Sequence, residues 1–137
     1  MDIQSYDHVG IRVSNRTRAL SFYRSLGFEV DEQQSHERVA EIVNAHGVRI
    51  ALIFNGTPYA GQKNILMDVD QKWPGYTHAA FIVPRLTELL DWAKKNDVVI
   101  TEGPVNWERR LTCFFRDPDG NVLEFNELLE EEGARDE

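Results

Sequence analysis

Two histidines and one glutamate are the residues of this chain whose types suit metal chemistry. His8 lies in the segment YDHVGIRV and His78 in the segment YTHAAFIV, and both segments alternate as half-buried strands do. Glu124 lies in the segment FFRDPDGNVLEF. Imidazole nitrogens and a carboxylate on rigid strands are suitable ligands for a divalent ion. For each residue taken alone, the alternative is an ordinary strand histidine or a carboxylate at a strand edge.

The stretch Phe114–Phe125 predicts a strand, a tight turn and a second strand. The turn residues 117–121 read DPDGN, in which proline presets φ, glycine accepts a positive φ, and Asp and Asn bond back to the backbone. Beyond the turn, Glu124 shares one strand face with Val122 and Asn126. A carboxylate in so apolar a run needs a cation, a proton or access to water.

The elements that must position these residues occur twice along the chain. Each half predicts the order strand, helix, strand, strand, strand. In the first half we expect a helix from Ser14 or Asn15 to Gly27, and strands at Tyr6–Val13, Phe28–Gln34, Glu37–Asn44 and Val48–Phe54. In the second half we expect a helix opening at Pro84 and ending at Asn96, and strands at Tyr76–Val83, Val98–Glu102, Leu111–Arg116 and Asn121–Glu127.

The two halves also align residue by residue. Tyr6–Val30 lies on Tyr76–Ile100 without a gap, so that His8 falls on His78. With a slightly larger offset, Ala51 falls on Glu124. We therefore predict an α+β fold in which two β-α-β-β-β modules form a curved mixed sheet around a central cleft. The matched placement of His8 and His78, together with Glu124, favours one shared metal site.

Four segments follow from this division. Residues 1–54 form the first module, 55–75 a linker with a possible short strand near Ile65–Val69, 76–127 the second module, and 128–137 an acidic tail.

Composition restricts the class of protein. The net charge of −8 argues against nonspecific binding of nucleic acid or acidic membranes. No apolar run approaches the ~18 residues of a membrane-spanning helix, and the segment MDIQSYDHV has no signal-peptide pattern. The single cysteine, Cys113, excludes an internal disulfide and fits a reducing compartment. We expect a cytoplasmic protein.

Several other residues are candidates for substrate binding. Arg12 and Arg49 should share a sheet face with His8 and could bind an anionic substrate, or reach solvent at the sheet edge. Trp107 and Arg109, with Arg110, lie in PVNWERR, which we predict to be a loop that could cover a pocket mouth or be merely solvated. Cys113 is expected to be a small core residue rather than a nucleophile.

The segments DHVGIRV, SFYRSLGF, THAAFIV and FFRDPDGNVLEF resemble the vicinal oxygen chelate superfamily, which includes glyoxalases, bleomycin-binding proteins and extradiol dioxygenases. The resemblance runs from about Tyr6 to Glu127. It implies metal ligands at His8, His78 and Glu124, and one divalent ion, which could be Fe, Mn, Zn, Ni or Co. It also implies a homodimer in which a site can draw ligands from both subunits.

At one position the chain departs from this pattern. Glyoxalases and epimerases of the family carry a fourth ligand where this chain has Ala51, which cannot bind metal. Among the three remaining ligands, only Glu124 could act as a base. The resemblance implies a metal-dependent enzyme acting on a small oxygen-bearing substrate as a glyoxalase-like lyase or isomerase. Its alternatives are an extradiol dioxygenase or thiol transferase, and a metal-free protein that binds a small molecule such as an antibiotic.

Overall fold

The computed structural model describes residues 1–58 and 63–130. Residues 59–62 of the predicted linker and most of the predicted acidic tail, 131–137, lie outside the described residues. The chain divides into two compact units, Met1–Lys63 and Asn64–Glu137. Within the described part of the chain, neither helix has the length and apolar character that crossing a bilayer requires.

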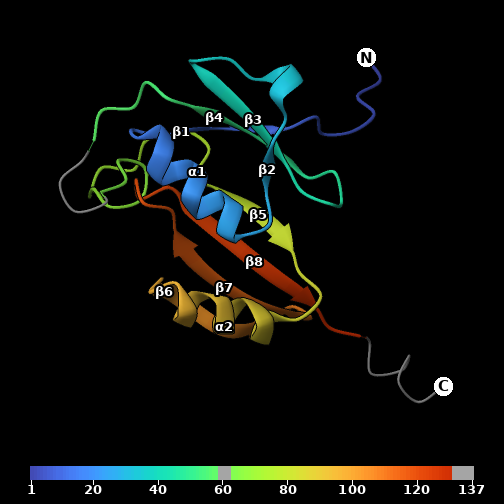
Figure 1. The fold of residues 1–137 in the computed structure, drawn as a ribbon. Coiled ribbons are helices and arrows are strands. Elements are labelled where there is room, and N and C mark those ends of the chain that lie inside the picture. The colour runs from blue at the N-terminus through green and yellow to red at the C-terminus, as the bar shows by residue number, and fades with distance from the viewer. Residues whose placement is uncertain (59–62, 131–137) are drawn as a thin grey trace. The chain divides into compact units, whose positions relative to one another are not determined.

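Each unit contains one helix and one four-stranded mixed sheet, labelled in Figure 1. The elements of the first unit are β1 (Val9–Arg12), α1 (Arg16–Ser25), β2 (Glu29–Val30), the short 3-10 helix η1 (Glu32–Gln34), β3 (Val39–Val43) and β4 (Arg49–Ile53). Those of the second are β5 (His78–Ile82), α2 (Leu86–Lys95), β6 (Ile100–Trp107), β7 (Arg110–Arg116) and β8 (Val122–Leu128). The prediction of an α+β fold with two β-α-β-β-β modules is confirmed.

The two sheets have the same topology and register. Their strand orders are β1-β4-β3-β2 and β5-β8-β7-β6, and in each the first and last strands of the unit pair in parallel. Gly10 lies opposite Ala51 in the first sheet, and Ala80 lies opposite Glu124 in the second. Ala51 and Glu124 therefore occupy equivalent positions, as the sequence alignment of the two halves predicts.

The helices begin through different caps. Asn15 caps α1, because its side-chain oxygen accepts a hydrogen bond from the Arg18 N–H at 2.9 Å. In α2 the preceding residue, Arg85, makes no side-chain cap, and Glu127 of β8 instead accepts from the Leu86 N–H at 2.8 Å. Pro84, expected at the first turn of α2, lies just before this cap. The hydrogen bond to Glu127 thus links the start of α2 to β8, the strand that carries Glu124.

The core of the second unit lies on the sheet face away from Glu124. Leu123, Phe125, Cys113 and Phe115 alternate onto that face and are buried, and α2 contacts the same two strands. The rings of Phe115 and Phe125 stack with centroids 4.7 Å apart. Cys113 is fully buried, and burial raises the pKa of its thiol to about 11. This placement agrees with its predicted role as a small core residue.

Four predicted segments differ most in the structure. The strand expected at Tyr6–Val13 is only Val9–Arg12, because the parallel pairing with β4 begins at Val9, and His8 therefore lies outside the strand. Ile65–Val69 is a turn rather than a strand, because the Asn64 side chain accepts hydrogen bonds from the Leu66 and Met67 N–H groups. The strand expected at Phe28–Gln34 is only Glu29–Val30. It ends where the Asp31 side chain caps η1 through the Gln33 N–H.

The fourth difference concerns PVNWERR, which is not a loop. β6 runs to Trp107 and β7 starts at Arg110, and these two residues pair across a two-residue turn. Both turn residues, Glu108 and Arg109, have a positive φ, of 44° and 66°. This is the type of turn that matches strand twist, but it usually contains glycine or asparagine. Without those residues the hairpin carried no sequence signal.

Candidate metal and substrate site in the second unit

His78 and Glu124 meet on the open face of the second sheet. β5 and β8 are parallel neighbours, and the register places the two side chains on the same face. His78 Nε2 lies 3.1 Å from Glu124 Oε1. The exposed fraction is 31% for the His78 side chain and 12% for that of Glu124. The carboxylate that the sequence places in an apolar run therefore has an imidazole partner and limited access to water.

The second oxygen of Glu124 is held by a buried polar chain. Asn126 Nδ2 donates to Glu124 Oε2 at 2.7 Å, and Thr112 Oγ1 donates to Asn126 Oδ1 at 2.6 Å. All three residues are buried. The sequence predicts that Asn126 lies on the strand face of Glu124, but it indicates no role for Asn126 or for Thr112. The residue spacing of two could have drawn attention to Asn126, whereas Thr112 is found only through the β7–β8 register.

Two further contacts orient His78. Its Nδ1 atom lies 2.8 Å from Thr77 Oγ1. Phe114 of β7 meets the imidazole edge to face, with ring centroids 5.5 Å apart. A hydroxyl can donate or accept, so Thr77 is compatible with either tautomer of His78. When Nδ1 carries the proton and donates to Thr77, the Nε2 lone pair is available to a ligand.

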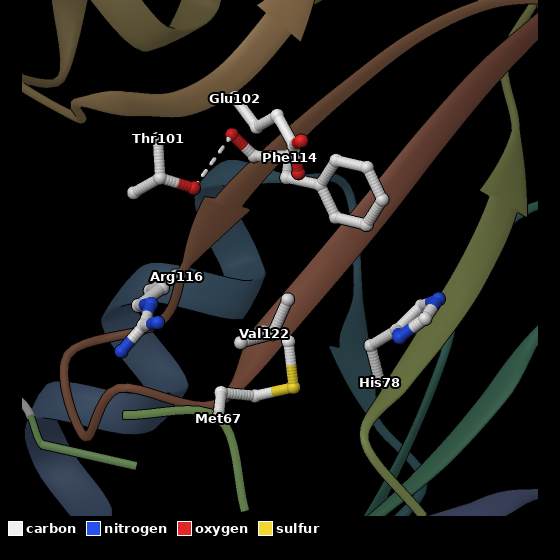
Figure 2. A pocket seen from close by; sticks show the side chains of 7 residues that line it. All are labelled: Met67, His78, Thr101, Glu102, Phe114, Arg116 and Val122. Carbon is white, nitrogen blue, oxygen red and sulfur yellow. Dashed lines mark hydrogen bonds between the residues drawn. The ribbon is translucent and has the colours of Figure 1, made fainter. Parts of the chain in front are cut away.

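A hollow of about 350 Å³ adjoins His78 (Figure 2). Its lining combines apolar side chains with a few polar ones: Met67, His78, Thr101, Glu102, Phe114, Arg116 and Val122. This is about the size of a small-molecule site, and such sites are mostly apolar with a few placed polar groups. His78, a predicted metal ligand, thus lines a space that could hold a small substrate, and Glu124 contacts His78.

An ion pair fixes one wall of this hollow. Arg116 donates two hydrogen bonds to Asp68, with N–O distances of 2.6 and 2.7 Å. The guanidinium of Arg116, followed by the Asn64 N–H, lowers the pKa of Asp68 to about 2, and the same hydrogen bond raises the pKa of Arg116. Met67 precedes Asp68 in this turn and lines the hollow. The positive charge of Arg116 is therefore paired with the Asp68 carboxylate in the wall of the hollow.

A second hollow, of about 320 Å³, shares Glu102 and Phe114 with the first. Trp107 and Val105 of β6 also line it, and Trp107 is 55% exposed. Of the predicted substrate-binding residues, Trp107 thus lies beside a space that could take a ligand. Arg109 lies in the adjoining hairpin turn, where its carbonyl accepts from the Leu129 N–H at 2.8 Å.

The remaining predicted residues belong to the first unit. His8 lies just before β1, is exposed, and its Nδ1 atom is 2.6 Å from an Asp7 carboxylate oxygen. Arg12 Nε donates to the side-chain oxygen of Asn55 at 2.9 Å. Ala51 is 7% exposed.

Arg49 lies between two carboxylates. Its Nη1 atom is 3.0 Å from Asp31 Oδ2 and 2.7 Å from Glu41 Oε1. The hydrogen bonds that Arg49 donates to Asp31, the larger cause, and to Glu41 raise the pKa of Arg49. An anionic substrate would have to compete with both carboxylates for this guanidinium. The geometry therefore gives less support to Arg49 as a substrate-binding residue than the sequence does.

The described residues bring together two of the three predicted metal ligands. His78 and Glu124 form a pair, and no group of three His, Cys, Asp or Glu side chains that could hold a metal ion occurs within residues 1–58 and 63–130. A metal at this pair would need a further protein ligand or several solvent ligands.

Comparison with known proteins places the fold. A glyoxalase/dioxygenase from Nostoc punctiforme has a similar structure, with a TM-score of 0.72 and 20% identity over 93% of this chain and 92% of that chain. TnmS3, an antibiotic binding protein from a Streptomyces species, has a TM-score of 0.68 and 19% identity, over 93% of this chain and 98% of that chain. An integron cassette protein from V. cholerae has a TM-score of 0.66 and 23% identity, over 93% of this chain and 97% of that chain.

Sequence comparison is more specific about the family. No curated protein matches the chain significantly. A family profile matches residues 5–125, which include both helices, the strands from β1 to β7, the first half of β8 and all of the predicted metal ligands. The chain belongs to the Glyoxalase/Bleomycin resistance protein/Dioxygenase superfamily.

Proposed function

We propose that the protein is a divalent-metal-dependent enzyme that acts on a small oxygen-bearing substrate, in the manner of the glyoxalase-like lyases and isomerases. The observation that carries this proposal is the His78–Glu124 pair beside the hollow of about 350 Å³. His8 is proposed as the third ligand, from the matched position of the first module. The ion could be Fe, Mn, Zn, Ni or Co, because all accept imidazole and carboxylate donors.

The spacing of the pair supports a shared ion. His78 Nε2 and Glu124 Oε1 are 3.1 Å apart, which is close enough that both atoms could hold one ion. The same separation serves as a hydrogen bond when no ion is bound. Thr77 can hold the Nδ1 proton of His78 and so direct the Nε2 lone pair toward the ion.

A bound ion would act as a Lewis acid on an oxygen of the substrate. The chain's own residues would bind and orient the rest of the molecule. Met67, Phe114 and Val122 offer apolar surface for its carbon frame and keep water from that side of the site. Glu124 is the residue among the proposed ligands that could accept a proton, and Asn126 holds its second oxygen.

The absence of a metal-binding side chain at position 51, which is alanine, bears on the reaction. With no fourth ligand at that position, more sites on the ion remain for a bidentate substrate, or for a substrate with O₂ or a thiol. Extradiol dioxygenase or thiol transferase chemistry is therefore the alternative within the enzyme class. Anaerobic identification of the bound metal separates these reactions, since Fe(II) favours oxygen chemistry and Zn, Ni or Mn favours the others.

Metal analysis of protein purified without chelators tests the proposal. We expect one divalent ion per chain in the parent, and loss of that ion in the variants His8→Ala, His78→Ala and Glu124→Gln. The matched control is His46→Ala, which changes an exposed histidine in a turn of the first unit. If His78→Ala keeps the metal content of the parent, or if the parent holds none after reconstitution, the proposal is wrong.

A metal-free binding protein is the second candidate. Its support is the second hollow, in which Trp107, Val105 and Phe114 offer an aromatic and apolar surface beside Glu102. TnmS3 is an antibiotic binding protein of the same fold. A planar cationic ligand should quench Trp107 fluorescence and bind equally well with EDTA present. Loss of binding in Trp107→Ala but not in His78→Ala would favour this candidate over the enzyme.

We also propose that the protein is a cytoplasmic homodimer. The family resemblance supports the dimer, and the single buried cysteine suits a reducing compartment. Sedimentation at micromolar concentration tests the assembly. Mixing His8→Ala with Glu124→Gln chains tests whether one site draws ligands from two subunits, because only a shared site would regain metal in the mixed dimer.

A further inference from the structure

We propose that Thr112 and Asn126 are positioning residues that fix the carboxylate of Glu124, so that one oxygen faces His78 and the other is withdrawn from metal binding. This inference rests on the proposed function in treating Glu124 as a ligand. It assigns roles to two residues that do not themselves bind the ion. Both belong to the strands that flank the site, β7 and β8.

The hydrogen bonds define a direction along this chain. A charged carboxylate can only accept, so Asn126 must turn its NH₂ group toward Glu124 Oε2, 2.7 Å away. The amide oxygen then points to Thr112, whose hydroxyl donates at 2.6 Å. A flipped amide would place its oxygen against the carboxylate. Thr112 thus stabilises the orientation of Asn126 that Glu124 requires.

Burial keeps water from competing for these hydrogen bonds. Thr112 is 2% exposed, Asn126 4% and Glu124 9%. At such burial, water does not readily replace a lost partner, and an unsatisfied polar group is costly. With Oε2 committed to Asn126, Glu124 offers Oε1 toward His78. The site therefore presents a carboxylate ligand that binds through a single oxygen.

The first unit serves as an internal comparison. Its sheet has the same register, in which Val39 lies opposite Ile53 just as Thr112 lies opposite Asn126. Ala51 takes the place of Glu124. The fold thus forms the same ladder with apolar residues at the Thr and Asn positions, and the unit that lacks the carboxylate also lacks both partners. Packing alone does not require the polar pair.

The experiment compares Thr112→Val, which keeps the shape and removes the hydroxyl, with Thr112→Ser, which keeps the hydroxyl. Mn²⁺ is the probe, and its affinity is measured by titration calorimetry. We expect Thr112→Val to weaken Mn²⁺ binding by about 10–100-fold, as loss of an outer partner of a ligand does, and Thr112→Ser to bind as the parent does.

A second readout does not depend on metal. In the metal-free protein, NMR signals of the Asn126 side-chain amide and the Glu124 carboxyl carbon should shift in Thr112→Val and remain as in the parent in Thr112→Ser. If Thr112→Val fails to fold, Asn126→Ala replaces it, and the signal of the Glu124 carboxyl carbon alone is then followed.

Each outcome decides one of the two proposals. If the parent binds no Mn²⁺, the proposed metal function fails, while the NMR comparison still decides whether Thr112 and Asn126 position Glu124. The positioning role is overturned if Thr112→Val leaves those signals unchanged. It is also overturned if Thr112→Ser weakens Mn²⁺ binding as much as Thr112→Val does, because a lost hydroxyl could not then be the cause.

Discussion

The ion pair between Asp68 and Arg116 should stabilise the turn that carries Met67 into the wall of the hollow. Both N–O contacts are short, and the Asn64 N–H also donates to Asp68 at 2.6 Å. The perturbations are Asp68→Asn, Arg116→Gln and the double variant. Together they form a double-mutant cycle that isolates the coupling between the two charges.

The geometry and exposure of the pair set the expected magnitude. The exposed fraction is 21% for the Arg116 side chain and 28% for that of Asp68, so solvent screens the interaction. Exposed ion pairs contribute about 0.2–1 kcal/mol, and two parallel hydrogen bonds place this pair at the upper end. We therefore expect a coupling free energy of about 1 kcal/mol at neutral pH and low salt, and a smaller one in about 1 M NaCl.

The pH dependence has a definite sign. The pKa of Asp68 is about 2 in the folded protein, below its ordinary value of 3.8. A carboxyl whose pKa is lower in the folded state contributes stability that is complete above the unfolded pKa and is lost as pH falls through the folded one. The coupling should thus be equal at about pH 7 and 5 and smaller at about pH 3.

Urea unfolding of the four proteins, followed by tryptophan fluorescence, supplies the free energies of unfolding. A coupling near zero at neutral pH and low salt would refute the assigned role of the pair. So would a coupling that increases on acidification, since that is the behaviour of a group whose pKa is raised by folding.

Three further predictions concern the turn, the core and the missing ligand. Asp117 is fully buried and accepts from the Asp119 N–H, the Asn121 N–H and the Asn121 side chain, so Asp117→Ala should lower the free energy of unfolding by about 2–3 kcal/mol in urea titrations. Cys113, with its pKa raised to about 11 by burial, should stay protonated and resist iodoacetamide in the folded protein but react in urea, as mass spectrometry can follow. The parent should turn over the methylglyoxal–glutathione hemithioacetal poorly with Ni, Zn or Mn, whereas Ala51→Glu should gain activity; high turnover by the parent would contradict the role given to Ala51.

The repeated order of strands and helices could be read from sequence because the segments alternate at the period of their element. Residues 9–12 and 78–82 show period-two alternation, and both helices carry an apolar face. The register that sets Ala51 and Glu124 at equivalent positions also followed from sequence, since both strands follow a glycine turn at the same distance.

Side-chain contacts across strands could not be read in this way. Thr112 lies opposite Asn126 only because the DPDGN turn joins β7 and β8 in one register, and a shift of one residue would turn Thr112 to the other face. The hairpin turn at Glu108 and Arg109 was not predicted, because neither residue type favours the positive φ that both adopt. The sequence thus predicted that Glu124 and Asn126 share a strand face, but not the hydrogen bonds that join Asn126 to Glu124 and to Thr112.

The first unit shows why Ala51 is not simply replaced by another nearby carboxylate. Glu41 lies directly opposite Ala51 in the β3–β4 ladder, at the position that Phe114 occupies opposite Glu124. Its carboxylate is already 2.7 Å from Arg49, and Arg49 also holds Asp31. Recruiting Glu41 to a cation would leave Arg49 with one fewer partner, at a cost comparable to a charge-assisted hydrogen bond. Glu41 is therefore not proposed as a ligand in place of Ala51, and the proposed set stays at His8, His78 and Glu124.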